Sequence, residues 1–429
     1  MKPGEKRVLL VGLAMFLFNV ALLPLPRSDH HLLSSDGGHY YAVMRSFWLD
    51  RDVDLDNDIA LYNARIPPDH PARLGASTAF SVGPALLWSP FFLPAHLVAH
   101  LGHAAGAPIA SDGWSALEEG AVALASVAYV VLGLWLLVCV IATCVPAAPA
   151  ASAVLGSFLA SAAAYYTLFE PTMSHTLELF STSLFLWVVL CRPLRRRRDA
   201  VCLGAIAGLV FLVRWQNVVL LSLLPLAFAM PAPREIRQRT IVENGIGIAL
   251  GFACLASLQL WFWHSTSGSL VTVPQGAGFL TPLQPQWLQV LFSTRHGLFT
   301  WTPVTLLGVA GLAWLRPRRL ALHASIAFLL ALYVCSIVAD WWGGDAFGMR
   351  RMIGILPLLV LGTAALLGTA GPRARRALQL ALVALVLWNG AFIVQYRLGL
   401  VSRSEALGFQ EMVLDKLRLP AELLARRAR

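Results

Sequence analysis

The chain has 429 residues, of which 57% are hydrophobic and 13% are charged. This composition excludes an ordinary water-soluble globular protein and predicts a chain that crosses a membrane several times. The net charge of +10 is also compatible with nucleic-acid binding, but its placement argues against such a partner. The basic clusters separate apolar segments, as expected for cytoplasmic loops. They occupy residues 192–198, 234–239, 316–319 and 373–376.

The first apolar segment covers residues 8–24 and follows Lys6 and Arg7. No small-residue cleavage site follows it, so we expect a retained first span with a cytoplasmic N-terminus. The six cysteines of the chain lie within or at the ends of apolar segments. Their spacing predicts small hydrophobic residues rather than a disulfide framework or a metal site.

The apolar segments predict an all-α, polytopic membrane helix bundle of about eleven spans, each near the length that a bilayer requires. We expect residues 1–394 to form this bundle and residues 395–429 to form a basic amphipathic tail on a membrane or protein surface. The predicted spans cover residues 8–24, 121–144, 151–168, 176–191, 201–213, 215–230, 241–263, 298–315, 320–338, 353–367 and 377–394.

Residues 79–101 are also apolar enough to span. A crossing here would move every later arginine cluster to the outer side, against the distribution of positive charge in membrane proteins. We therefore predict an interfacial or re-entrant element that is broken at Pro84, Pro90 and Pro94. A long first outer loop with interfacial helices, residues 25–119, follows from this prediction.

Residues 201–230 are too long for one span, because a single helix would measure about 45 Å at 1.5 Å per residue. We predict two short spans with a hinge at Arg214. This arrangement places Arg214 near the outer face, level with the acidic first loop.

Asp36 is the first candidate for chemistry. It follows the first span and precedes Gly37 and Gly38. Glycines let a backbone approach a ligand closely, so the carboxylate is a candidate general base for an acceptor hydroxyl. An alternative stays open, in which Asp36 or Ser35 caps the following helix.

Residues 52–58 carry four aspartates, and their spacing has some likeness to a calcium loop. The sequence lacks the glycine at the sixth position, and Asn63 stands where the loop needs a bidentate glutamate. Alternation with Val53 and Leu55 predicts a short extended connector in which the aspartates are structural or solvated.

Glu170 falls at the outer end of a predicted span. It is a candidate second acid, or a metal ligand shared with Asp36. His175 and Glu178 follow, three residues apart and therefore on one face of the next helix. The alternative is that these polar residues only bond to neighbouring helices.

Basic residues recur in two later outer segments, and Trp341, Trp342 and several glycines accompany them. Arginine binds phosphate oxygens bidentately, and glycine-rich turns expose backbone donors to anions. Two alternatives are an aromatic belt at the membrane interface and arginines that bond to lipid headgroups. The candidate binding residues here are Arg295, His296, Asp345, Arg350 and Arg351.

At these residues the chain resembles the GT-C-type membrane glycosyltransferases, in particular the bacterial branch related to protein O-mannosyltransferases and aminoarabinose transferases. Four pieces in order carry the resemblance. They are residues 36–41 (DGGHYY), 83–87 (GPALL), 173–175 (MSH) and 342–350 (WGGDAFGMR).

The resemblance implies a GT-C-like fold in the bacterial inner membrane, with an active site on the outer face. It also implies a polyprenyl-phosphate-linked sugar donor, inversion at the anomeric carbon and Asp36 as the catalytic acid of the first loop. Further candidate substrate-binding residues are His39, Tyr40, His175 and Arg214. The family often has a second acid next to the first, where this chain has Gly37. A divalent cation, Mg or Mn, is therefore left open.

Two other classes of function stay open. A lipid or sugar transporter or flippase would show internal repeats, broken helices and charges deep in its spans. A polysaccharide ligase in envelope assembly would share the lipid-phosphate chemistry. The polar residues are predicted to gather at one face, which favours the glycosyltransferase. The sequence leaves open whether the acceptor is a glycan, a lipid or a protein.

Overall fold

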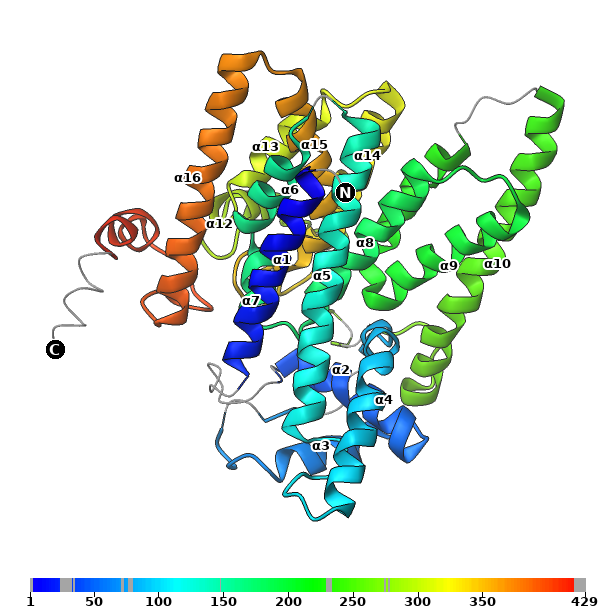
Figure 1. The fold of residues 1–429 in the computed structure, drawn as a ribbon, viewed down its shortest axis with the longest axis vertical. Coiled ribbons are helices and arrows are strands. Elements are labelled where there is room, and N and C mark those ends of the chain that lie inside the picture. Colours follow the sequence, from blue (N-terminus) through cyan, green and yellow to red (C-terminus); the bar gives the residue numbers. More distant parts are fainter. Residues whose placement is uncertain are drawn as a thin grey trace. The chain divides into compact units, whose positions relative to one another are not determined.

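The computed structural model describes residues 3–23, 33, 35–70, 73–75, 80–146, 148–228, 234–273, 275–276 and 278–419. Within these ranges the elements are helices (Figure 1). The described residues also contain a single isolated antiparallel bridge, between Leu280 and Val338. The predicted all-α class is confirmed.

The helices of the first half are α1 (Pro3–Leu22), α2 (Ser35–Arg45), η1 (Ser46–Asp50), α3 (Leu55–Asn63), α4 (Gly83–Ala104), α5 (Ala116–Cys144), α6 (Ala150–Leu159), α7 (Ala162–Phe169), α8 (Ser174–Cys191) and α9 (Arg197–Val213). The second half contains η2 (Trp215–Phe228), α10 (Arg234–Ser267), α11 (Trp287–Phe292), α12 (Leu298–Trp301), α13 (Val304–Leu312), α14 (Arg318–Ser336), η3 (Arg350–Ile355), α15 (Leu356–Thr369), α16 (Pro372–Arg397) and η4 (Gln410–Leu414). Here η1 and η4 are π-helical turns, and η2 and η3 are 3-10 helices.

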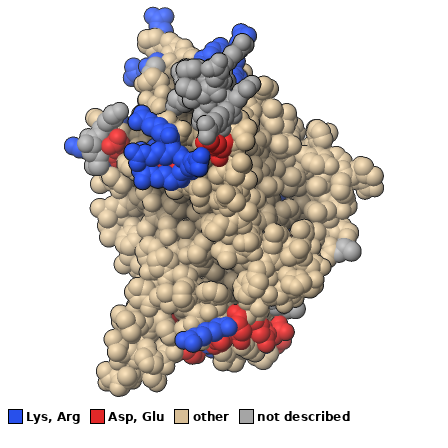
Figure 2. Space-filling view, turned by 90° about the vertical axis from the view of Figure 1, so that its right-hand side faces the viewer, with Lys and Arg blue, Asp and Glu red and all other residues tan. Residues whose placement is uncertain are grey.

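Seven helices among the described residues are long and apolar enough to cross a membrane, or eight if the bent pair α6–α7 forms one span. This set of helices is that of a multi-pass membrane protein. Figure 2 agrees, since most of the surface on view carries neither Lys or Arg nor Asp or Glu. The seven are α4, α5, α8, the part of α10 from Ile241 to Ser267, α14, the combined η3–α15 and α16.

The predicted total of about eleven spans is not confirmed, for local reasons. Glu5, Lys6 and Arg7 lie inside α1 and shorten its apolar part. The predicted span 298–315 is divided between α12 and α13, and 215–230 forms a 3-10 helix of 14 residues. The predicted span 151–168 is bent by 72° between α6 and α7.

The prediction that three prolines break the segment 79–101 is wrong. Helix α4 is continuous over 22 residues, with Pro84 in its first turn and Pro90 and Pro94 inside it. Proline is favoured at the start of a helix, and an internal proline in an apolar helix removes one hydrogen bond without necessarily ending the helix. By contrast, the predicted hinge at Arg214 is confirmed, because α9 ends at Val213 and Arg214 has an extended backbone.

The chain divides into two compact units. Unit 1 contains Met1–Val8, Leu137–Tyr165 and Gly278–Arg429, and unit 2 contains Leu9–Leu136 and Tyr166–Ala277. The chain therefore passes back and forth between the units along its length.

In unit 2, glycines let α9 and α10 pack with their backbones in close contact. A Cβ atom added at Gly204 would overlap the carbonyl of Ile248, and one added at Gly251 would overlap that of Val201. Small residues four apart on both helices are typical of membrane helix packing. Gly83 at the start of α4 similarly faces the backbone at the end of α9.

In unit 1, the segment after α16 packs on that helix. The Lys416 ammonium lies 4.0 Å from the ring centre of Trp388 and 3.4 Å from that of Phe392. Leu407 and Met412 are buried. The described part of the predicted tail, up to residue 419, therefore lies on a protein surface, which is one of the two surfaces expected.

Candidate functional site

Asp36 lies in the first turn of α2 and is half-buried. A carboxylate here complements the positive end of the helix dipole, which agrees with a stabilising role in the helix start. A Cβ atom at Gly37 would lie 2.7 Å from Thr172 Oγ1, and one at Gly38 would lie 2.7 Å from Leu74 Cδ2. The two glycines thus make room for other parts of the protein.

The contact at Gly37 also places the start of α2 beside the turn that joins α7 to α8. Glu170 begins this turn and is half-buried, and its carbonyl accepts the N–H of Met173 at 3.1 Å. The structure therefore brings together the segments that carry the two predicted acids, Asp36 and Glu170.

His39 and Tyr40 share one partner. The ring of Phe80 stacks on His39 at 4.7 Å and meets the ring of Tyr40 edge-on at 5.1 Å. Burial lowers the pKa of His39, and nearby Asp36 opposes this effect. His39 is therefore neutral near pH 7, and its buried Nδ1 has no hydrogen-bond partner among the described residues. A neutral imidazole so placed can accept or donate a proton.

Glu178 is the centre of a polar network inside unit 2. Its side chain is buried and accepts a hydrogen bond of 2.9 Å from Asn217 Nδ2. His175 Nδ1 lies 3.1 Å from the same carboxylate, and Arg214 Nε lies 3.6 Å from it. A buried carboxylate in an apolar helix is costly unless it is paired, and these three partners provide the pairing.

The network extends from α8 to α2. Arg214 Nη1 donates to Ser174 Oγ at 3.0 Å, and Ser174 Oγ donates to the Tyr40 hydroxyl at 3.1 Å. Three of the predicted site residues, Tyr40, His175 and Arg214, are therefore connected through polar contacts. The sequence prediction did not include Ser174 or Asn217, and it gave Glu178 no role beyond its spacing from His175. A carboxylate inside an apolar span was the available signal for Glu178.

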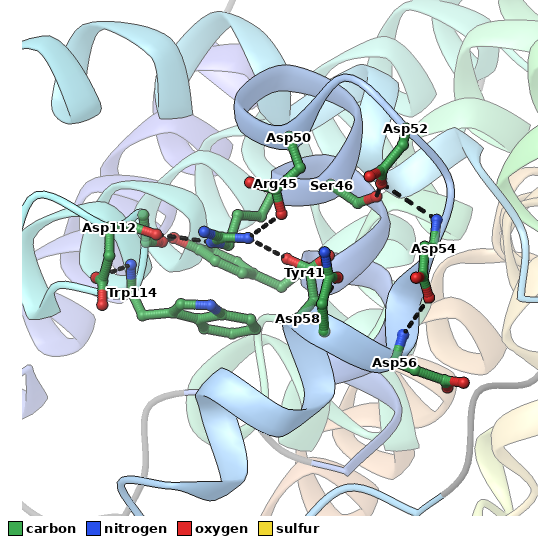
Figure 3. A network of polar contacts seen from close by, with 12 residues as sticks. Tyr41, Arg45, Ser46, Asp50, Asp52, Asp54, Asp56, Asp58, Asp112 and Trp114 are labelled. Atoms are coloured by element: carbon green, nitrogen blue, oxygen red, sulfur yellow. Dashed lines mark hydrogen bonds and ion pairs between the residues drawn. The ribbon is translucent and has the colours of Figure 1, made fainter.

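The acidic residues from Asp50 to Asp58 hold neighbouring segments together through hydrogen bonds and ion pairs (Figure 3). Arg45 donates to Asp50 and to Asp58, each at 2.6 Å, and to the backbone carbonyl of Asp112 at 2.6 Å. Burial raises the pKa of Asp58 to about 7. These contacts fix the end of α2 to α3 and to the segment before α5.

Two further aspartates of this run shape the backbone. Asp54 accepts the N–H of Asp56 at 3.1 Å and caps α3, while Asp52 accepts from Ser46 Oγ at 2.8 Å. The structural role predicted for the run is thus supported. The predicted extended connector is wrong from Leu55 onward, where α3 begins.

Among the described residues, no group of three or more His, Cys, Asp or Glu side chains is arranged to hold a metal ion.

The remaining predicted residues lie in unit 1. The Arg295 guanidinium stacks 3.9 Å from the ring centre of Trp342, and it lies 4.0 Å from Glu405. His296 Nδ1 lies 2.8 Å from the Trp342 carbonyl oxygen, and burial lowers the pKa of His296 to about 4. Trp342 thus contacts Arg295 through its ring and His296 through its backbone carbonyl. A tryptophan that only anchors the protein at the membrane interface does not need such contacts.

Arg351 pairs with Asp340 at 2.6 Å. Gly343 and Gly344 adopt positive φ angles of 77° and 69°. A Cβ atom at Gly343 would lie 3.1 Å from Arg350 Nε, so the glycine makes room for that guanidinium.

Asp345 in the same segment is exposed. Arg295, Arg350 and Arg351 therefore lie in unit 1, while Arg214 and the two acids belong to unit 2.

No family model, curated protein or solved structure matches this chain. The likeness to GT-C glycosyltransferases therefore depends on the four sequence pieces.

Proposed function

We propose that the chain is a membrane glycosyltransferase that moves a sugar from a polyprenyl-phosphate-linked donor to an acceptor, at the outer face of the bacterial inner membrane. The observation that carries the proposal is the buried network of Tyr40, Ser174, Glu178 and Arg214, together with the contact of Gly37 on Thr172 that places the Asp36 turn beside it. Charged groups are costly in an apolar helical protein, so a paired set beside a half-buried acid is a candidate for function.

In the proposed reaction, Asp36 takes the proton from the acceptor hydroxyl. The acceptor oxygen then bonds to the anomeric carbon of the sugar as the bond from that carbon to the phosphate oxygen breaks. The lipid phosphate leaves with the electron pair. Inversion follows because attack and departure take place on opposite faces of the sugar.

Arg214 is the proposed partner of the leaving phosphate. Glu178 and Ser174 hold its guanidinium in one orientation, and a fixed cation stabilises developing negative charge better than a mobile one. His39 and Tyr40 are proposed to line the sugar. In unit 1, Arg295, Arg350 and Arg351 are proposed to bind lipid phosphate groups. No step passes through a metal ion.

A transporter or flippase is the second candidate, and one observation favours it. The pair α6–α7 is bent by 72°, as in a broken span, and broken helices are common in carriers. A polysaccharide ligase shares the lipid-phosphate chemistry of the first proposal and differs in the size of the group that is transferred.

The test is a transfer assay with the purified full-length protein in lipid vesicles. A panel of polyprenyl-phosphate donors with radiolabelled sugars is mixed with membrane extract as acceptor, with and without EDTA. We expect one donor to give a labelled product that carries a single added sugar. Movement of a fluorescent lipid phosphate between leaflets without any transfer would instead support the flippase.

A further inference from the structure

Unit 2 contains an apolar cavity of about 110 Å³ that the proposed chemistry does not use. Residues of α2, η1, α4 and α10 line it, and Ser89 is the only lining residue with a hydroxyl group. That hydroxyl already accepts from Trp48 Nε1 and donates to the Ala85 carbonyl, each at 2.6 Å. The only other polar groups of the lining are the indole N–H groups of Trp48 and Trp261, and an apolar cavity of this order takes up apolar ligands rather than water.

The mouth of the cavity is hydrophobic as well. Phe47, Leu86 and Trp261 line the cavity and are 50%, 43% and 50% exposed. Trp261 belongs to the part of α10 that is long and apolar enough to span. An exposed apolar side chain on a spanning helix contacts lipid hydrocarbon, so a lipid chain can reach the cavity from the side of α10.

The cavity also lies next to residues of the candidate site along α2. Val43 and Met44 line the cavity and lie one helical turn after His39 and Tyr40, on the same face. The same helix therefore carries Asp36 at its start and two lining residues of the cavity near its end.

The segment just before α4 makes a second connection. Phe80 contacts the rings of His39 and Tyr40, and Val82 lines the cavity. Gln259 of α10 accepts the N–H of Val82 at 2.9 Å and donates to the Phe80 carbonyl at 3.2 Å. The segment from Phe80 to Val82, held by Gln259, therefore contacts the candidate site at one end and lines the cavity at the other.

We propose that this cavity binds the isoprenoid chain of the donor, in the part next to the phosphate, and so directs the phosphate toward the Asp36 end of α2. The inference rests on the proposed function, since it assigns the donor lipid to a place beside that site. The cavity is apolar at its lining and its mouth, and its α2 residues lie one turn from His39 and Tyr40, which matches a lipid with one charged head and a single chain.

The test uses polyprenyl monophosphate without a sugar, with a photoreactive diazirine in the isoprene unit next to the phosphate. Full-length protein in nanodiscs is irradiated, and the labelled residues are identified by mass spectrometry. We expect labelling of residues in η1, α4 and α10 that line the cavity. Excess unlabelled polyprenyl phosphate should abolish the labelling, and excess phosphatidylglycerol should not. Labelling spread over the lipid-facing surface, or equal competition by phosphatidylglycerol, would overturn the proposal.

Two variants fill the cavity, Leu86→Trp at its mouth and Ala85→Phe inside it. Each should reduce cavity labelling about tenfold, the loss expected when about two methylene groups of the chain are displaced. Leu97→Trp is the matched control, because Leu97 lies on the same helix, is 58% exposed and does not line the cavity. Leu86→Trp changes a part-exposed position and keeps the test valid if Ala85→Phe fails to fold. Full labelling of a folded Leu86→Trp protein would contradict the proposal.

Because the probe carries no sugar, binding is scored separately from transfer. Labelling of the cavity in a protein that transfers no sugar would refute the proposed function and support the lipid site. Transfer by a protein whose cavity stays unlabelled would refute the lipid site alone.

Discussion

At the residue scale, Glu178 decides how the polar network of unit 2 is arranged. Its carboxylate is the common partner of His175, Arg214 and Asn217. Removal of one member of a buried ion pair leaves the other charge uncompensated, whereas removal of both can be nearly neutral.

The first prediction follows from this asymmetry. We expect Glu178→Ala to lower the free energy of unfolding by about 3–5 kcal/mol, and Glu178→Ala with Arg214→Met to lower it by less. Chemical unfolding in mixed detergent micelles measures both values. Strictly additive effects of the two substitutions would show that the pair does not couple.

The second prediction concerns Asp58, whose folded-state pKa of about 7 lies above the value of 3.8 for an unperturbed aspartate. Burial is the main cause; in addition, Arg45 is shared with Asp50, and Asp58 Oδ2 has no hydrogen-bond partner among the described residues. The unfolded chain therefore loses the Asp58 proton at lower pH than the folded chain does. The contribution of Asp58 to stability is present below pH 3.8 and is lost as the pH rises to about 7.

The measurement compares wild type with Asp58→Asn, which cannot ionise. The free energy of unfolding of wild type relative to the variant should fall as the pH rises from about 4 to about 7, and then level off. A difference that is flat from about pH 4 to about 7 and rises only at lower pH would mean that Arg45 lowers the pKa of Asp58 more than burial raises it.

At the scale of elements, α4 was predicted only in part. Its prolines predicted a break that the structure does not have. The expectation that the segment does not cross the membrane has support from another contact. Arg65, before α4, forms an ion pair with Asp112, after it, and donates to the Trp114 carbonyl. Segments that meet in this way lie on the same side of the membrane.

The third prediction tests this arrangement. Single cysteines replace Asp69 and Ala105, two exposed residues on either side of α4, in a chain without its six native cysteines. A membrane-impermeant maleimide should label both positions from the same side of sealed vesicles. Labelling from opposite sides would establish that α4 crosses the membrane.

The fourth prediction concerns the contact of α9 with α10. We expect Gly204→Ala to lower the free energy of unfolding by about 1–3 kcal/mol, because the added methyl group forces the two backbones apart. Gly245→Ala is the control, since a Cβ atom there meets nothing within 4 Å and alanine favours a helix. An equal effect of the two substitutions would show that close packing at Gly204 does not stabilise the helix pair.

The bends of the spans separate what the sequence could predict from what it could not. The hinge at Arg214 was predictable, because bilayer thickness limits the length of a span. The division between α12 and α13 had a local signal in Pro303, which follows Thr302. The bend between α6 and α7 had none. There the side chain of Asn389 donates to the carbonyls of Leu159 and Ser161, and this contact joins residues far apart in the chain.

At the scale of the whole molecule, composition predicted a multi-pass helical membrane protein. Long apolar segments are stable in a bilayer, and there a helix satisfies the backbone hydrogen bonds internally. The division into two interleaved units was not predictable, since it depends on contacts between distant segments. The candidate site was predicted in part for the same reason. Sequence patterns marked Asp36, His175 and Arg214, while the central position of Glu178 follows from tertiary packing.

The most direct test of the central claim compares Asp36→Asn with Asp54→Asn in the sugar-transfer assay. Both aspartates lie at the start of a helix after the first apolar segment, and Asp54 caps α3, a role that asparagine can fill. If Asp36 is the general base, Asp36→Asn should lose about a hundredfold or more in rate, while Asp54→Asn stays near the wild-type rate. Equal activity of folded Asp36→Asn and wild type would contradict the account, leave Asp36 with a role in the helix start and make Glu170 the next candidate for the base.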